Sequence, residues 1–170
     1  MSVQRTRRAP ELRQVILEAL MVLEATLSAL DLIRERLAEI EETLVNATEG
    51  GEGARAFAAA RYRELREAID ETAALAERGG FNLIAGARSG IEITLGKCGQ
   101  GAIAIGPVDL RAAEGLGLPP IEDEFADTMS IDRARDALAA AQTRLARASQ
   151  VFIADAAMLS KVFQDLPREV

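Results

Sequence analysis

The string ILEALMVLEATLSALDLIRERLAEIEETL, residues 16–44, decides the fold of this 170-residue chain. Its aliphatic residues recur in steps of three and four, a spacing typical of a long helix with one apolar seam. No Gly or Pro interrupts residues 11–45, so the pattern predicts a helix over residues 11–46. About 36 residues at 1.5 Å each give a rod of roughly 54 Å. A compact domain of this size cannot hold such a helix, and the molecule is therefore predicted to be elongated. The seam consists of Ile16, Leu20, Leu23, Leu27, Leu30, Ile33, Leu37, Ile40 and Leu44.

A second helix is predicted over residues 54–78. The string EGGEG at residues 49–53 separates it from the first helix and is interpreted as a turn. Gly79 and Gly80 follow it, and glycine readily adopts the left-handed conformation that ends many helices. The face predicted to be buried consists of Phe57, Leu65, Ile69, Thr72 and Ala76.

The period of the sequence then changes from that of a helix to that of a strand. Apolar and polar residues alternate in IEITL at residues 91–95, and AIAI at residues 102–105 follows a loop with three glycines. Two short strands around such a loop predict a β-hairpin over residues 91–106. Because an isolated hairpin is marginally stable in water, we expect it to lie against the helices.

A third long helix is predicted over residues 128–164, after an irregular and acidic stretch at residues 106–127. Its apolar seam fails at Asp155 and resumes one residue later. The sequence therefore predicts a mainly α fold, an elongated bundle of three long helices with a small β-hairpin inserted before the last helix. The seam consists of Ile131, Ala134, Leu138, Ala141, Leu145, Ala148 and Phe152, followed by Ala156, Leu159 and Phe163.

The composition excludes most catalytic chemistry. The chain contains no His, no Trp and a single Cys, and 4% of its residues are aromatic. Without His it has no Ser-His-Asp or Cys-His nucleophile and no imidazole ligand for zinc. A net charge of −7 disfavours nucleic acid, and no run of 18 apolar residues is present to span a membrane. We expect no enzymatic activity, no catalytic residue, no cofactor, no metal and no small-molecule substrate, which leaves other proteins as partners.

Three local features are better explained by structure than by ligand binding. Cys98 has no partner within the chain, and the glycines of residues 96–101 precede a strand rather than the helix that a phosphate-binding loop requires. The acidic residues near residue 124 lack the D-x-D-x-D-G spacing of a calcium loop, so we interpret them as a solvated acidic turn. They are Glu122, Asp123, Glu124 and Asp127.

The remaining expectations concern the ends of the chain and the width of the first seam. We expect residues 1–9 to be a disordered basic terminus, residues 10–166 to form one rod domain, and residues 167–170 to be a short tail. Val15, Val22 and Leu32 lie off the main seam and could widen its apolar stripe toward a neighbouring molecule.

Several strings, in this order, resemble the inner rod domain of bacterial flagellin and of hook–filament junction proteins. The pattern L-x-x-I-x-E-x-x-V-x-A at residues 37–47 resembles the end of the first rod helix. The strings ELREAID at residues 64–70 and GFNLIAG at residues 80–86 resemble the second rod helix and the F-N-G-x-x-L string after it. The hairpin and VDLRAAEGLGL at residues 108–118 resemble the rod hairpin and its exit, and residues 131–145 resemble the returning helix. In that helix Leu138, Ala140, Gln142 and Arg144 match the string L-G-A-V-Q-N-R-F.

This resemblance implies a structural role outside the cell. Flagellin-type rods pack side by side in the bacterial flagellar filament, so other flagellin-type subunits would be the partners. The resemblance also points to Glu41, Glu42, Gln142 and Arg144 as a possible protein-interaction surface. Glu41 stands where flagellins commonly have an Arg, on a surface shared by subunit packing and by the innate immune receptor for flagellin.

Two departures from the family leave an alternative open. The terminal segments that pair in the core of a flagellin filament have no counterpart in this sequence, so we expect the chain not to polymerise alone. The reversed charge at Glu41 puts the usual contacts in doubt. The alternative function is a cytoplasmic flagellar regulatory or export-partner module that binds a chaperone or regulator through its helices. An unrelated helical adaptor is a third possibility, and a structure without the hairpin would favour it.

Overall fold

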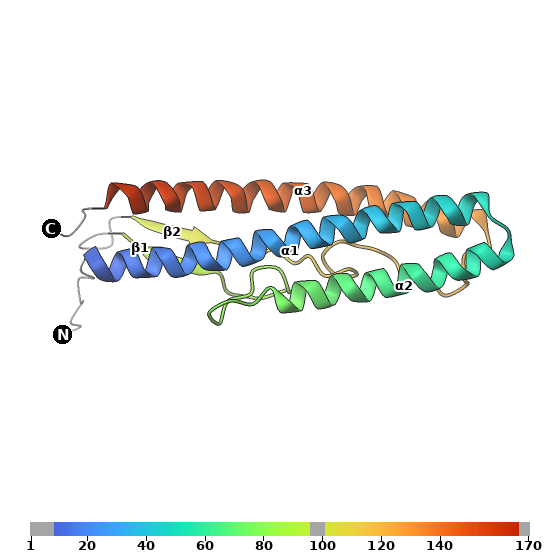
Figure 1. Cartoon of the computed structure of the whole chain (residues 1–170), viewed down its shortest axis with the longest axis horizontal. Coiled ribbons are helices and arrows are strands. Elements are labelled where there is room, and N and C mark those ends of the chain that lie inside the picture. The colour runs from blue at the N-terminus through green and yellow to red at the C-terminus, as the bar shows by residue number, and fades with distance from the viewer. Residues whose placement is uncertain (1–8, 96–100, 167–170) are drawn as a thin grey trace.

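The structure, a computed structural model, describes residues 9–95 and 101–166, which form three helices and one hairpin. The helices are α1 (Ala9–Glu49), α2 (Glu52–Leu75) and α3 (Thr128–Asp165), and the strands are β1 (Ile91–Thr94) and β2 (Ala102–Ile105). The predicted fold class is confirmed, because three helices form an elongated bundle and the hairpin precedes the last helix (Figure 1). Residues 1–8, the tail at 167–170 and Cys98 lie outside the described residues.

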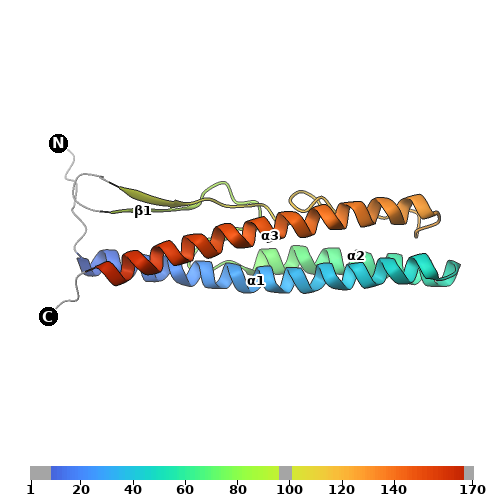
Figure 2. The same cartoon turned by 90° about the horizontal axis from the view of Figure 1, so that it is seen from above.

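The rod is built on an antiparallel pair of helices, α1 and α3, which pack along each other (Figure 1). The 41 residues of α1 give a length of roughly 60 Å at 1.5 Å per residue. α2 lies beside one half of this pair, and the hairpin lies against one face of the other half (Figure 2). At the hairpin end the Arg13 guanidinium lies 4.2 Å from the centre of the Phe163 ring and donates a 3.2 Å hydrogen bond to the Leu166 carbonyl. These contacts fasten the start of α1 to the end of α3.

The apolar seams of α1 and α3 are the core. Seven of the nine seam residues predicted on α1 are buried, while Leu20 and Leu27 are partly buried and pack against the others. On α3 the predicted seam is buried from Ile131 to Phe152 and again at Leu159. The other two residues predicted after the break, Ala156 and Phe163, are partly buried and pack against the core. Asp155, where the seam is interrupted, is half-buried, and this burial raises the pKa of its carboxyl group. Of the off-seam residues, Val22 is buried, Val15 is partly buried and Leu32 is exposed.

The buried face of α2 includes Leu65, Ile69 and Ala76, as predicted, whereas Thr72 is partly buried and the start of the face differs from the prediction. Phe57 was predicted to be buried, but 75% of it is exposed. The reason is a shift of one residue, about 100° around the helix, because the face begins at Ala58 and includes Tyr62. Steps of three and four then carry this face to the end of the helix. Its buried residues are Ala58, Ala59, Tyr62, Leu65, Ile69 and Ala73, and Ala76 continues it just after the helix.

α2 ends at Leu75, before the glycine pair that was expected to end it. Gly79 and Gly80 instead form a tight turn at φ +60° and +83°, in which Arg78 and Phe81 exchange two backbone hydrogen bonds. The Asn82 amide then donates hydrogen bonds of 2.8 and 3.1 Å to the carbonyls of Ala73 and Ala74. Asn82 therefore satisfies the carbonyls that the end of α2 leaves open.

The hairpin is antiparallel, with Ile91 paired to Ile105 and Ile93 to Ile103. All four isoleucines are buried, whereas Glu92 and the other alternate residues are exposed. The period of two in the sequence thus gives one face toward the helices and one toward solvent.

Residues 106–127, which we call the strap, connect the hairpin to α3. They are irregular, as predicted, but they are not a loose surface loop, because six of their apolar side chains are buried. These are Leu110, Ala112, Leu116, Leu118, Ile121 and Phe125. The strap also bonds to both α2 and α3, so it connects two helices that barely touch directly.

Candidate functional site

The structure brings Glu41 of α1 and Gln142 of α3 together on the outside of the helix pair. The Gln142 side-chain amide donates a 3.1 Å hydrogen bond to a Glu41 carboxylate oxygen. The two residues are 101 positions apart in sequence, and the antiparallel run of α1 and α3 places them at the same height. Two of the four residues that the sequence singled out therefore form one polar bridge.

A shallow groove of about 280 Å³ lies beside this bridge. Leu44, Val45, Leu138 and Ala139 provide its apolar part, and Arg135 stands with Glu41 and Gln142 at its polar rim. Glu42 is exposed on the neighbouring side of α1, about 100° around the helix from Glu41. An apolar floor with a charged rim can contact another protein, and it offers no arrangement for acid–base or nucleophilic chemistry.

The structure separates Arg144 from the other three residues. Two positions along α3 correspond to about 200°, so Arg144 lies on the opposite side of that helix from Gln142. Its guanidinium donates hydrogen bonds to the carbonyls of Leu116, at 2.8 Å, and Gly115, at 3.3 Å. A side chain at Gly117 would place its Cβ 2.5 Å from the Arg144 Nη1 atom. Arg144 therefore holds the strap within its own chain.

Other anchors of the strap were missed by sequence reasoning. The Tyr62 hydroxyl donates a 3.1 Å hydrogen bond to the Pro119 carbonyl, and its ring meets the Phe125 ring edge to face at 5.8 Å. Burial raises the pKa of Tyr62 to about 12. The Asp70 carboxylate accepts a 2.6 Å hydrogen bond from the backbone amide of Ala112. The spacing of Tyr62 with Leu65 and the later face residues of α2 was the signal that could have revealed it as buried.

Ion pairs around Glu39 and within the strap lie at the polar edges of the rod. The Glu39 carboxylate of α1 accepts hydrogen bonds from Arg36 at 2.5 Å and from Arg61 of α2 at 2.6 Å. The Arg36 bond, more than the Arg61 bond, holds the pKa of Glu39 below its usual range. In the strap the Arg111 guanidinium binds both oxygens of Asp109 and lowers the pKa of that carboxyl. Because all five side chains are partly exposed, these pairs orient their segments more than they stabilise the fold.

The acidic turn of the sequence lies at the far end of the rod. Glu122, Asp123, Glu124 and Asp127 are exposed, and Asp127 caps α3 by accepting a 2.7 Å hydrogen bond from the Ser130 amide. Among residues 9–95 and 101–166, no three acidic or Cys side chains are grouped so that they could hold a metal ion. Within the same residues, no helix combines the length and the apolar character needed to cross a membrane.

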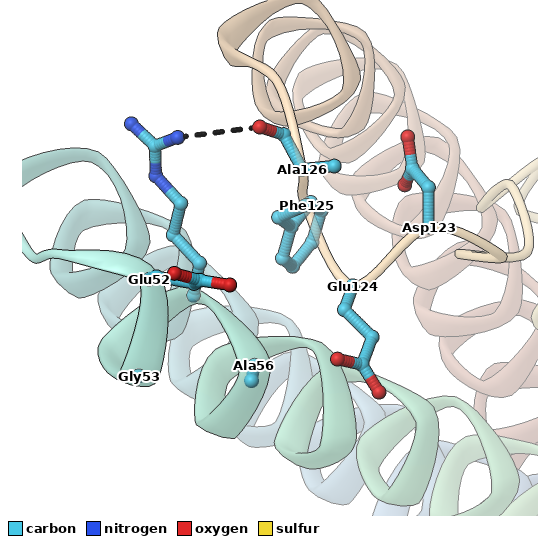
Figure 3. Close-up of a pocket in the computed structure, with 8 residues that line it drawn as sticks. Glu52, Gly53, Ala56, Asp123, Glu124, Phe125 and Ala126 are labelled. Atoms are coloured by element: carbon cyan, nitrogen blue, oxygen red, sulfur yellow. Dashed lines mark hydrogen bonds between the residues drawn. The ribbon is translucent and has the colours of Figure 1, made fainter.

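Two larger hollows lie at opposite ends of the rod. One, of about 620 Å³, lies between α1, the turn at residues 78–81 and β1, with Val22, Phe81 and Ile91 among its lining residues. The other, of about 660 Å³, lies between the first turn of α2 and the end of the strap (Figure 3). Both are open to solvent, and neither resembles an enclosed ligand cavity.

These features define the chain as an elongated helical rod with a hairpin. Its fold is that of flagellin. The structure matches the crystal structure of Bacillus cereus flagellin with a TM-score of 0.78 over 99% of this chain and 95% of that chain, at 15% sequence identity. No protein-family model matches the sequence, and no curated protein matches it in sequence. The flagellin-like fold predicted from the ordered strings is confirmed.

Proposed function

We propose that this chain is a non-enzymatic structural subunit of flagellin type, which packs side by side with other such subunits in a bacterial flagellar filament outside the cell. The observation that carries the proposal is the match to Bacillus cereus flagellin over 99% of the chain. A match over 99% of the chain extends well beyond α1 and α3, so it concerns the whole rod rather than a shared helix pair.

The shape of the molecule supports a packing role. A rod roughly 60 Å long with a core only two or three helices wide exposes much of its surface along its sides. Several apolar side chains remain on that surface, among them Leu17, Met21 and Ile153. A neighbouring rod would cover such side chains.

Within this function we propose that Glu41, Gln142 and the adjoining groove form a contact to the neighbouring subunit, with Glu42 at its edge. The bridge between Glu41 and Gln142 holds the carboxylate in place before a partner arrives, which lowers the entropy cost of association. Because the carboxylate carries negative charge, the complementary surface should be basic.

Fractionation of cells that carry the gene tests the proposed function. Filaments sheared from the cell surface, purified and analysed by mass spectrometry, should contain peptides of this chain. If the peptides occur in the cytoplasm alone, the filament role is contradicted and the alternative of a cytoplasmic partner module is favoured.

Charge reversal at Glu41 tests the proposed contact. Glu41→Arg should reduce the amount of chain recovered in sheared filaments by about tenfold, because it places like charges together. Glu41→Gln keeps the size of the side chain and should reduce recovery less. Glu67→Arg, the same change at an exposed residue of α2, is the matched control. Equal recovery of Glu41→Arg and Glu67→Arg would remove Glu41 from the contact.

A further inference from the structure

The end of the strap, residues 122–127, has an unusual backbone conformation. Glu124 and Phe125 have φ angles of +53° and +58°, the only positive φ values at residues other than glycine in the described parts of the chain. Residues with a Cβ rarely adopt this left-handed backbone conformation, because the Cβ comes too close to the following carbonyl oxygen. Two such residues in succession persist only where the surrounding contacts impose the conformation.

The side chain of Phe125 supplies a contact of this kind. Phe125 is fully buried and packs edge to face on Tyr62 of α2. Toward the start of α2 the segment accepts a side-chain hydrogen bond, in which Arg55 donates to the Ala126 carbonyl at 3.4 Å (Figure 3). That bond is long for a hydrogen bond. The segment is therefore held to α2 by the ring of Phe125, against the preference of its own backbone.

An open cleft separates part of the segment from the first turn of α2. The cleft of about 660 Å³ separates Glu52 and Ala56 of α2 from Asp123 and Glu124 of the strap, as Figure 3 shows. Three carboxylates border it and Arg55 is the single basic residue in its lining. Like charges on the two sides of the cleft oppose its closure.

We propose that residues 122–127 are a latch that opens from α2 and closes onto it while the rod stays folded, with Phe125 as the side chain that holds it closed. In the open state Glu124 and Phe125 leave the left-handed region, and Tyr62 loses its aromatic neighbour. The seam between α1 and α3 does not take part. This equilibrium belongs to the isolated chain and does not depend on the proposed filament role.

Amide hydrogen exchange measures the opening directly. The Ala126 amide donates to the Asp123 carbonyl within the latch, so it exchanges when the latch opens. We expect it to exchange much faster than the amide of Leu30, which lies in the middle of α1 and exchanges on global unfolding. Exchange of both amides at the global rate would overturn the proposal.

Two substitutions of Glu124 distinguish the effect of backbone strain from the effect of the carboxylate charge. Glu124→Gly removes both, whereas Glu124→Ala removes the carboxylate but keeps a Cβ in the left-handed region. Exchange at Ala126 should be about two- to fivefold slower in Glu124→Gly than in Glu124→Ala, because glycine adopts the closed backbone without strain. Equal rates in the two variants would contradict a strained latch.

Tyr62 provides a second readout, because it is the only Tyr in a chain without Trp. Phe125→Ala should open the latch and lower the pKa of Tyr62 from about 12 toward its ordinary value, seen in the ultraviolet titration of the phenol. Circular dichroism should show an unchanged helix content. If Phe125→Ala does not fold, Phe125→Leu serves in its place. A folded variant whose Tyr62 titrates as in the parent chain would overturn the role of Phe125.

Discussion

The α1–α3 seam and the strap bury their apolar side chains by different means. Along the seam a repeat of three and four residues delivers one buried side chain after another, and the helical backbone satisfies its own hydrogen bonds. The strap has no repeat and no helical backbone. Its amides and carbonyls are satisfied one at a time, some by backbone groups within the strap or at residues 83 and 84, and others by side chains of the helices, such as Asp70, Tyr62 and Arg144.

This difference predicts how each region responds to substitution. A seam residue loses packing when it is truncated, and the loss scales with the volume removed. A strap residue loses a hydrogen bond or a backbone geometry, which costs less free energy but affects one anchor specifically. The following substitutions test that distinction, in order of expected effect on the free energy of unfolding.

The largest effect is expected from Leu30→Ala in the seam. Leu30 is fully buried, so the substitution leaves a cavity and should lower the free energy of unfolding by about 2–5 kcal/mol. Leu32→Ala, two residues away at an exposed position, should change it by no more than about 0.5 kcal/mol. Urea denaturation followed by circular dichroism gives both values. Similar values for the two variants would show that the seam has been misplaced.

The second largest loss of stability is expected from Gly115→Ala, which creates a clash with the backbone. At Gly115 an added Cβ would lie 2.2 Å from the Asp109 carbonyl oxygen, so Gly115→Ala forces the strap to move. We expect a loss of about 1–3 kcal/mol. Gly106→Ala, also in the strap, is the matched control, since its Cβ would meet nothing within 4 Å and its φ is not positive. Denaturation of both variants tests whether the strap is as tightly packed as the structure indicates, and a neutral Gly115→Ala would argue that it is not.

Tyr62→Phe should lower the free energy of unfolding by about 1 kcal/mol, because the Pro119 carbonyl loses its hydrogen-bond donor.

The Tyr62 hydroxyl also predicts how the stability of the fold depends on pH. Since burial raises the pKa of Tyr62 to about 12 in the folded state, its contribution is fully present below the ordinary pKa of about 10 and is lost as the pH rises toward 12. Stability measured from pH 9 to 12 should therefore fall more steeply in the parent chain than in Tyr62→Phe. Parallel curves would place the phenol in solvent.

The smallest effect is expected at Arg144. Arg144→Ala removes two hydrogen bonds to strap carbonyls, but these bonds are partly exposed, so the loss should be about 0.5–1 kcal/mol. Arg147→Ala, at an exposed position three residues later, should be close to neutral. Hydrogen exchange of the Leu118 amide, which donates within the strap, should accelerate in the first variant and not in the second. Equal exchange rates of the Leu118 amide in Arg144→Ala and Arg147→Ala would show that Arg144 does not hold the strap in place.

The same contrast explains what the sequence could predict. The seams of α1 and α3 and the isoleucines of the hairpin were predictable because burial there follows a period of 3.6 or 2. On α2 the prediction was correct at Leu65, Ile69 and Ala76 but wrong at the start of the face, since Phe57 is larger and more apolar than Ala58, which lies on the true face. The anchors of the strap could not be predicted, because Asp70 and Ala112 are 42 residues apart and only the fold brings them together.

The candidate surface shows the same limit. The resemblance to flagellin supplied Glu41, Glu42, Gln142 and Arg144 as one set, on the strength of matching strings. The structure pairs Glu41 with Gln142 and places Arg144 on the other side of α3, where it binds the strap. Two positions on a helix differ by about 200°, so neighbours in a string need not share a surface.

The central claim, that this chain works by packing as a flagellin-type rod, is tested most directly by electron cryomicroscopy of sheared filaments that contain it. We predict density for the rod with α1 and α3 side by side, the hairpin at one end, and a neighbouring subunit against Glu41 and Gln142. Filaments whose reconstruction has no place for this rod would contradict the claim.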